Sequence, residues 1–274
     1  MPTPRRRVAL ATLLLATALA AAQSSSDQLK PSSSCDKAIN QGILALQNAR
    51  YDAAIQNFKA AAALDPTSNR ARLYLGTAYA YQVVPNLDTP ENLALSNNAI
   101  EVLKKIPDGT PEYLDALKQI ANAYRNSIRL DSAKETELQI LKADTNDAEA
   151  HYTIGVLDWM QAYKNVVRIL ATAYLTDDGN GNTKLNISAC QELSAQNSAL
   201  VQDAIDHLTR AIDLKPDYDD AMQYLNLTYR RHADLACGDE TKRTDDLALA
   251  DLWSKKTMDF RRKHEAALIA PKPQ

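Results

Sequence analysis

The chain has 274 residues, of which 24% are charged, and its formal net charge is −3. This mildly acidic balance argues against a general nucleic-acid-binding protein, whose footprint is a basic face. Seven glycines, two phenylalanines and a large share of Ala and Leu fit an all-helical chain, and no alternating pattern indicates a strand.

Residues 1–22 have the pattern of a secretory signal peptide. Arg5, Arg6 and Arg7 precede an apolar run from Val8 to Ala20 that is too short to span a bilayer stably. Loss of these three arginines by cleavage would lower the formal net charge from −3 to −6 and leave a polar linker at residues 23–34. We expect a periplasmic or secreted protein with no stable membrane span. The alternative is a retained membrane anchor.

A period of 34 residues organises the next part of the chain. It separates Gly42 from Gly76, and Ala121 from Gly155. A period of this size is typical of stacked helical hairpins, because one hairpin cannot bury its own apolar face. The small residue at each position lets two helices approach closely.

The second helix of each hairpin has a signature of its own. The spacing Ala-x3-Phe/Leu-x2-Ala-x4-Pro occurs twice, at Ala54, Phe58, Ala61 and Pro66, and again at Ala204, Leu208, Ala211 and Pro216. Pro cannot continue a helix and restricts the residue before it, so we expect each hairpin to stop at the same place.

This pattern resembles the tetratricopeptide repeat family over about residues 35–235. The resemblance implies an all-α solenoid of four to five antiparallel helical hairpins, whose first helices line a concave groove. The sequence departs from the family pattern at Thr145, where Pro is usual, and at Asn226, where Gly is usual. The residues that carry the likeness are those named above together with Tyr51, Leu75, Tyr79, Tyr124, Ala133, Ile154, Leu225 and Tyr229.

Two units are irregular. Gly76 and Ala121 are 45 residues apart, which indicates an 11-residue insertion in the second hairpin. Gly155 and Asn226 are 71 residues apart, and two interpretations are open: a hidden degenerate repeat, or one extended hairpin over about 147–214. We favour the extended hairpin, with helices at about 147–175 and 188–214, because no Gly or Pro interrupts residues 156–175.

The C-terminal part is predicted to cap the array. From Asp245 onward a long helix places Ala250, Trp253, Thr257 and Phe260 along one face, which would cover the last apolar surface of the solenoid. We expect the repeat domain to span residues 35–264 and residues 265–274 to be a disordered tail.

The three cysteines allow one disulfide in an exported protein. Cys190 precedes one helix and Cys237 follows the next, and these helices should run antiparallel. The sequence therefore predicts a Cys190–Cys237 disulfide with Cys35 unpaired, and the alternative is three free thiols.

The sequence indicates no catalytic residue, cofactor or metal site. The four histidines lack the spacing of metal ligands, and no Gly-rich phosphate loop is present. Residues 177–182 resemble a calcium loop only in part, because Thr183 and Ala189 replace the required Gly and Glu. We therefore predict that the protein is not an enzyme.

The groove is the remaining candidate for a binding site. Lys118 and Asn122 resemble the first half of the family's clamp for a C-terminal carboxylate, but Thr153 and Asp220 replace its second half, so that activity is not predicted. The residues expected to face a partner are Arg70, Tyr81, Lys118, Asn122, Arg125, Tyr152, Trp159 and Arg230, with Arg231 beside the last of them.

These features predict an exported, non-catalytic scaffold that binds a peptide or partner protein in its concave groove. One alternative is a structural subunit that self-associates through the terminal helix or the protruding hairpin. Another is an enzyme or ligand carrier that uses a pocket between the extended hairpin and Trp159.

Overall fold

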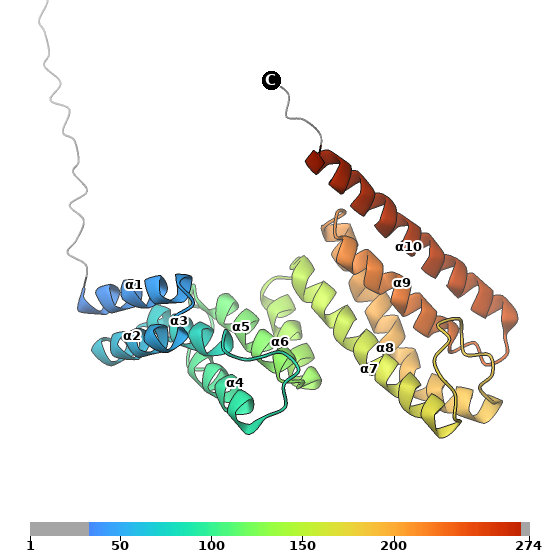
Figure 1. The fold of residues 1–274 in the computed structure, drawn as a ribbon, viewed down its shortest axis with the longest axis horizontal. Coiled ribbons are helices and arrows are strands. Elements are labelled where there is room, and N and C mark those ends of the chain that lie inside the picture. The colour runs from blue at the N-terminus through green and yellow to red at the C-terminus, as the bar shows by residue number, and fades with distance from the viewer. Residues whose placement is uncertain (1–32, 270–274) are drawn as a thin grey trace, which may run out of the picture.

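The computed structural model describes residues 33–269, and within this range all regular secondary structure is helical (Figure 1). The signal peptide predicted at residues 1–22 and most of the predicted linker lie outside the described residues. The ten helices of this range are α1 (Ser34–Gln47), α2 (Tyr51–Leu64), α3 (Asn69–Ala80), α4 (Pro90–Leu103), α5 (Tyr113–Asn126), α6 (Leu130–Ala143), α7 (Ala148–Thr172), α8 (Ile187–Leu214), α9 (Asp219–Ala233) and α10 (Glu240–Ile269).

Successive helices pair into five hairpins that follow one another in a row (Figure 1). Local sequence sets the helix boundaries. The side chains of Ser68, Asp147 and Asn186 each accept a hydrogen bond from a backbone N–H three residues on, which satisfies a donor that the first helical turn leaves free. Helices α2 and α8 end just before Pro66 and Pro216, as the sequence predicts.

The glycines of the 34-residue period mark close helix crossings. An added Cβ atom would lie 2.4 Å from the Phe58 ring at Gly42 and 2.5 Å from Leu208 Cγ at Gly155. The side chains of Phe58 and Leu208 are both fully buried at these crossings. The period therefore reflects a steric requirement between the two helices of one hairpin.

The irregular fourth unit is a single long hairpin. Helix α7 has 25 residues and α8 has 28, and the segment 173–186 between them contains no helix. The structure therefore agrees with the extended hairpin and not with a hidden degenerate repeat. Its tip protrudes beyond the neighbouring hairpin of α5 and α6 (Figure 1).

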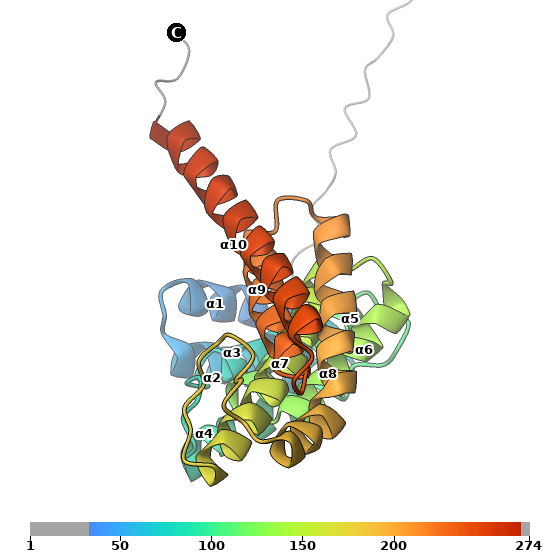
Figure 2. The same cartoon turned by 90° about the vertical axis from the view of Figure 1, so that its right-hand side faces the viewer.

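Helix α10 closes the array against α9. Ala250 and Thr257 are buried there, and Trp253 packs on a cluster that includes Leu208 and Leu225. The C-terminal end of α10 extends beyond α9, as Figures 1 and 2 show. The predicted start of a disordered tail at residue 265 is wrong for residues 265–269, which continue α10 because no helix-breaking residue occurs before Pro271. Residues 270–274 lie outside the described range.

The stacking of first helices is interrupted in the middle of the array. Helix α3 contacts α1 and α5, and α7 contacts α9, but α5 and α7 share no pair of Cα atoms within 8 Å. The helices of the two halves meet through α6 and α7 instead. Lys134 on α6 strengthens this junction, because its Nζ lies 2.7 Å from Asp158 Oδ1 on α7 and 2.6 Å from Asp203 Oδ2 on α8.

None of the helices in residues 33–269 combines the length and the apolar character that a membrane crossing requires.

Candidate functional site

The gap between α5 and α7 holds a pocket of about 200 Å³. Charged side chains from three helices surround it, and we call it the charged pocket. Helix α5 forms one wall of the pocket, and α7, with its N-cap residue, forms the opposite wall. Helix α6 contributes one carboxylate. Its lining residues are Lys118, Asn122, Arg125, Glu137, Asp147, Glu149, Ala150 and Thr153.

Glu137 is a buried charge of this pocket without an ion-pair partner among residues 33–269. Its residue is only 7% exposed, and it makes no hydrogen bond or ion pair with any residue of the described range. Burial raises the pKa of its carboxyl group to about 7, and the positive charge of Arg125 opposes this rise. The carboxyl group therefore lies close to half-ionised at neutral pH.

Lys118 and Asp147 form the opposite side of the pocket. Lys118 Nζ lies 2.6 Å from Asp147 Oδ2, and the hydrogen bond to this carboxylate raises the pKa of Lys118. Asp147 also caps α7 by accepting a hydrogen bond of 2.9 Å from the backbone N–H of Ala150. Arg125 donates a hydrogen bond to Asn122 Oδ1 on its own helix. Three residues that the sequence predicts for the groove thus line one pocket.

Five aromatic side chains from α7, α9 and the turn between α8 and α9 adjoin the charged pocket, and we call them the aromatic row. The ring centroid of Tyr152 lies 4.8 Å from that of Tyr218 and 5.9 Å from that of Tyr224. Trp159 lies 5.3 Å from Tyr224 and stacks on Tyr163 at 5.4 Å.

The two features are joined by a hydrogen bond. The hydroxyl group of Tyr218 donates a hydrogen bond to Glu149, which lines the charged pocket, while the Tyr218 ring belongs to the aromatic row. Tyr163 at the far end of the row is 39% exposed and offers its ring to solvent. The arrangement therefore combines a charged recess with a partly exposed apolar strip, which suits recognition of a charged side chain and its neighbours.

Two predicted groove residues lie in the N-terminal half, outside this site. Arg70 Nη1 on α3 lies 3.5 Å from Asp36 Oδ1 on α1, in a largely exposed ion pair. Tyr81 caps the C-terminus of α3 and is 59% exposed. Their contact with a partner stays a prediction.

The structure uses the remaining predicted groove residues internally. Arg230 donates hydrogen bonds to the carbonyl oxygen of Gly179 at 3.0 Å and to Asp251 Oδ1 at 2.9 Å. Arg231 is only 4% exposed and pairs with Asp177 at 3.0 Å and Asp234 at 3.2 Å. Both arginines fix the segment 173–186, Arg231 against α9 and Arg230 against α9 and α10. Arg231 is too buried to face a partner, whereas contact of Arg230 with a partner stays a prediction.

That segment is folded on itself. Asp178 Oδ1 accepts hydrogen bonds from the backbone N–H groups of Asn180 and Asn182 at 2.8 and 3.0 Å.

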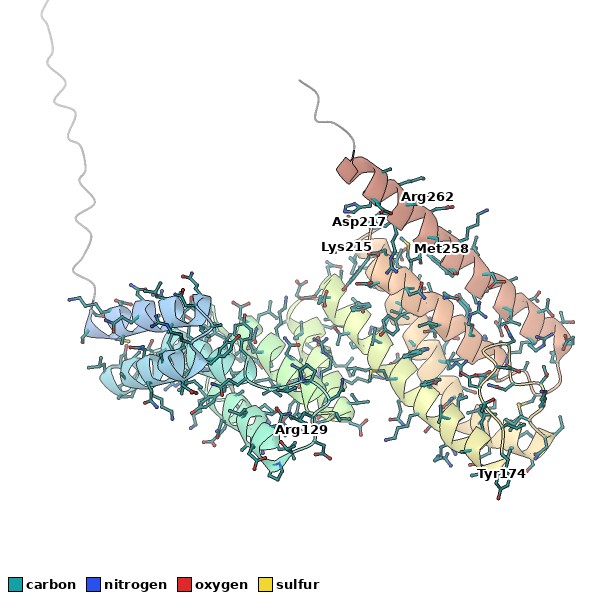
Figure 3. All side chains as sticks on the ribbon, in the orientation of Figure 1. Arg129, Tyr174, Lys215, Asp217, Met258 and Arg262 are labelled. Carbon is teal, nitrogen blue, oxygen red and sulfur yellow. A yellow bond between two sulfur atoms is a disulfide. The ribbon has the colours of Figure 1, made fainter. Side chains whose placement is uncertain are left out.

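Among residues 33–269, no group of three or more His, Cys, Asp or Glu could hold a metal ion. Tyr174 points away from the tip of the hairpin and is 97% exposed (Figure 3).

A disulfide holds the base of the protruding segment. Cys190 at the start of α8 is bonded to Cys237 in the turn after α9, with an S–S distance of 2.06 Å. Cys35 is a buried free thiol. This is the pairing that the antiparallel helix order predicts.

Sequence reasoning missed Glu137, although a signal for it is present. Ala133, Glu137 and Ile140 have helical spacing and are all buried on one stripe of α6. A carboxylate at the centre of an apolar stripe is unusual and marks a position for inspection. Tyr218 and Tyr224 were also missed, because their contacts with Tyr152 join helices far apart in sequence.

Comparison with known proteins gives structural likeness only. No protein-family model and no curated protein sequence matches the chain significantly. A crystal structure of the MamA protein is 18% identical and has a TM-score of 0.54, with 87% of this chain and 98% of that chain covered. MamA from Desulfovibrio magneticus RS-1 is 16% identical over 84% of this chain and 96% of that one, with a TM-score of 0.53. YrrB, described as a TPR protein with an unusual peptide-binding site, is 14% identical over 83% and 90%, with a TM-score of 0.49.

At these identities the likeness establishes the fold. The ten helices, the glycines at the hairpin crossings and the similarity to MamA agree with the pattern read from the sequence. The chain has a tetratricopeptide-repeat-like fold, an α-solenoid of helical hairpins.

Proposed function

We propose that this protein is a non-catalytic interaction scaffold, exported to the cell envelope, that binds a peptide or partner protein on the face formed by the charged pocket and the aromatic row. The observation that carries the proposal is the junction of these two features at Glu149 and Tyr218. A partner that spans them meets charge and aromatic surface together. Interface hot spots are enriched in Tyr and Trp, and the aromatic row supplies both.

The location of this site suits the architecture. A solenoid presents an extended surface made by successive hairpins, and an extended or helical peptide can follow it. The separation of α5 from α7 adds a recess to a surface that continuous stacking would have filled. A side chain of the partner can enter this recess while its neighbours lie along the aromatic row.

Two observations support export. The first is the signal-peptide pattern of residues 1–22. The second is the Cys190–Cys237 disulfide, since such bonds persist in oxidising compartments and are rare in the cytosol.

The test is crosslinking in cells followed by mass spectrometry. The native protein is compared with Tyr163→Ala, which shortens the exposed end of the aromatic row, and with Tyr174→Ala as a matched control at the hairpin tip. We expect one envelope protein to be captured by the native chain and by Tyr174→Ala, and to be lost from Tyr163→Ala while circular dichroism stays unchanged.

Other outcomes would redirect the assignment. Loss of the partner from Tyr174→Ala alone would move the contact to the hairpin tip. Capture of nothing but copies of this chain would favour the structural-subunit alternative. For that alternative Trp253 is an unsuitable probe, because it packs within its own chain.

A further inference from the structure

We infer that the charged pocket receives a cationic side chain, the ammonium of lysine or the guanidinium of arginine, from the bound peptide, with Glu137 as its counter-ion. This inference rests on the proposed function, because it assumes that a peptide lies on this face. It adds the chemistry by which the site selects that peptide.

Glu137 is isolated from the other side chains of the described range. A carboxylate that is more than nine-tenths buried normally has a hydrogen-bond or ion-pair partner, since burial of an unpaired charge is costly. Glu137 has none within residues 33–269, yet it lines an open pocket. A ligand that enters the pocket can supply the missing partner.

The cations near Glu137 have other partners. Lys118 pairs with Asp147, and Lys134, one turn before Glu137 on the same helix, pairs with Asp158 and Asp203. Arg125 donates to Asn122 and forms no ion pair with Glu137. Its charge is close enough to favour ionisation of Glu137 without neutralising it.

The charges that line the pocket favour a cationic ligand. The lining contains two cations, Lys118 and Arg125, and three carboxylates, Glu137, Asp147 and Glu149. With all of them ionised the pocket carries one net negative charge, which a single monocation cancels. An anionic side chain would instead raise the net negative charge of the pocket from one to two.

The volume of the pocket suits a single side chain. Sites for drug-sized ligands are typically about 300–1,000 Å³. The charged pocket, at about 200 Å³, is smaller and suits the end of one long side chain. The adjoining aromatic row then provides contact for the residues on either side of that side chain.

Binding of a cation should be linked to loss of a proton. Glu137 is flanked by Lys118 and Arg125 on α5, by Asp147 at the N-cap of α7 and by Glu149 on α7. Its carboxyl group has a pKa of about 7 in the free protein. A cation binds the ionised form, so affinity should rise as pH increases through 7. At pH 7 binding should release about half a proton.

The experiment uses two end-blocked synthetic peptides of sequence Gly-Tyr-X-Tyr-Gly. In one X is lysine, and in the other X is norleucine, which keeps the apolar stem and removes the charge. Isothermal titration calorimetry is run on the full mature chain at pH 6 and pH 8, and at pH 7 in two buffers of different ionisation enthalpy. Glu137→Gln is compared with the control Glu135→Gln, which changes an exposed carboxylate on the same helix.

We expect the lysine peptide to bind the native chain about tenfold more tightly than the norleucine peptide at pH 8, with a smaller ratio at pH 6. Glu137→Gln should bind both peptides alike and release no proton, whereas Glu135→Gln should behave as the native chain.

Equal binding of both peptides by the native chain would overturn the cation site and leave the scaffold proposal intact. Failure of both peptides to bind at millimolar concentration would also overturn the cation site. The scaffold proposal is judged independently by the crosslinking experiment, so the two failures can be told apart.

Discussion

Glu137 lowers the stability of the folded protein at neutral pH, and it provides the charged pocket with a carboxylate that can bind a ligand. Its folded-state pKa, about 7, is higher than the ordinary value of 4.5, so the folded protein holds this proton more tightly than the unfolded chain does. The stability contributed by its protonated form is therefore present at low pH and is lost as pH rises from about 4.5 to 7. A buried carboxylate kept at this cost is more readily explained by binding than by stability.

Glu137→Gln should accordingly raise the free energy of unfolding at pH 8, by up to about 3 kcal/mol, and change it little at pH 4.5. Glutamine keeps the size of the side chain and removes the ionisation. The measurement is urea unfolding of both proteins at the two pH values, with Glu135→Gln as the exposed control. Equal destabilisation by Glu137→Gln at both pH values would mean that its carboxyl group has a stabilising partner.

Gly155 is a residue whose role lies in the contact between two helices. An added Cβ would lie 2.5 Å from Leu208 Cγ and 3.2 Å from the backbone oxygen of Ala204. Leu208 is completely buried and cannot move aside freely. The crossing of α7 and α8 therefore requires glycine for close approach.

Gly155→Ala should destabilise the protein by about 1–3 kcal/mol, because overpacking outweighs the gain of about 1 kcal/mol in helix propensity. Leu208→Ala opens a cavity at the same place. The double variant should lose less stability than the sum of the two single variants, which a double-mutant cycle of urea midpoints will show. Strict additivity would contradict the predicted steric contact.

At the scale of helices, the junction of α6, α7 and α8 depends on Lys134. This ammonium lies between Asp158, which is buried, and Asp203. Burial raises the pKa of Asp158 to about 7 even beside this cation. Removal of the lysine charge should lower the free energy of unfolding, because the Asp158 carboxylate would stay buried without a cation.

Lys134→Met should lower the free energy of unfolding by about 2–4 kcal/mol at pH 8. The loss should be smaller at pH 6, since Asp158 can then take up a proton and no longer needs a cation. Lys142→Met, at an exposed position of α6, is the control. A loss that does not depend on pH would indicate that the lysine stem, rather than its charge, stabilises the junction.

The sequence reveals those helical features that are local and repeated. Gly42, Gly76 and Gly155 recur because each hairpin needs a small residue at its crossing, and the Cys190–Cys237 pairing follows from the order of antiparallel helices. The hydrogen bonds of Arg230 could not be predicted from the sequence, because its partners, Gly179 and Asp251, lie on two other segments. Such contacts depend on how a long irregular loop folds, which no periodicity encodes.

The site was predicted in part for the same reason. One face of a single helix carries Lys118, Asn122 and Arg125, so the sequence spacing predicts that they point in the same direction. The isolation of Glu137 depends on the separation of α5 from α7, which is a property of the whole array. The isolation of Glu137 can be recognised only when the three-dimensional stacking of the hairpins is known.

At the scale of the whole molecule, the interrupted stacking divides the array into α1–α6 and α7–α10. Solenoid stability is approximately the sum of repeat stabilities and nearest-neighbour interfaces, so a weaker interface can separate two unfolding steps. Both tryptophans, Trp159 and Trp253, and the Cys190–Cys237 disulfide belong to the second part. Tryptophan fluorescence therefore reports on α7–α10 alone, whereas far-ultraviolet circular dichroism reports on every helix.

Reduction of the disulfide should lower the stability of α7–α10 by about 2–4 kcal/mol, because the unfolded chain regains the freedom of a loop that spans 47 residues in sequence. In urea with reductant, the fluorescence midpoint should fall, and the circular dichroism curve should split into an early step for α7–α10 and a later step for α1–α6. Cys35→Ala in the same buffers controls for the free thiol.

If the fluorescence and circular dichroism curves still coincide after reduction, the contacts between α6 and α7 couple the two parts into one cooperative unit. The gap that forms the charged pocket would then be a fixed feature of a rigid array, and a partner would find the pocket preformed.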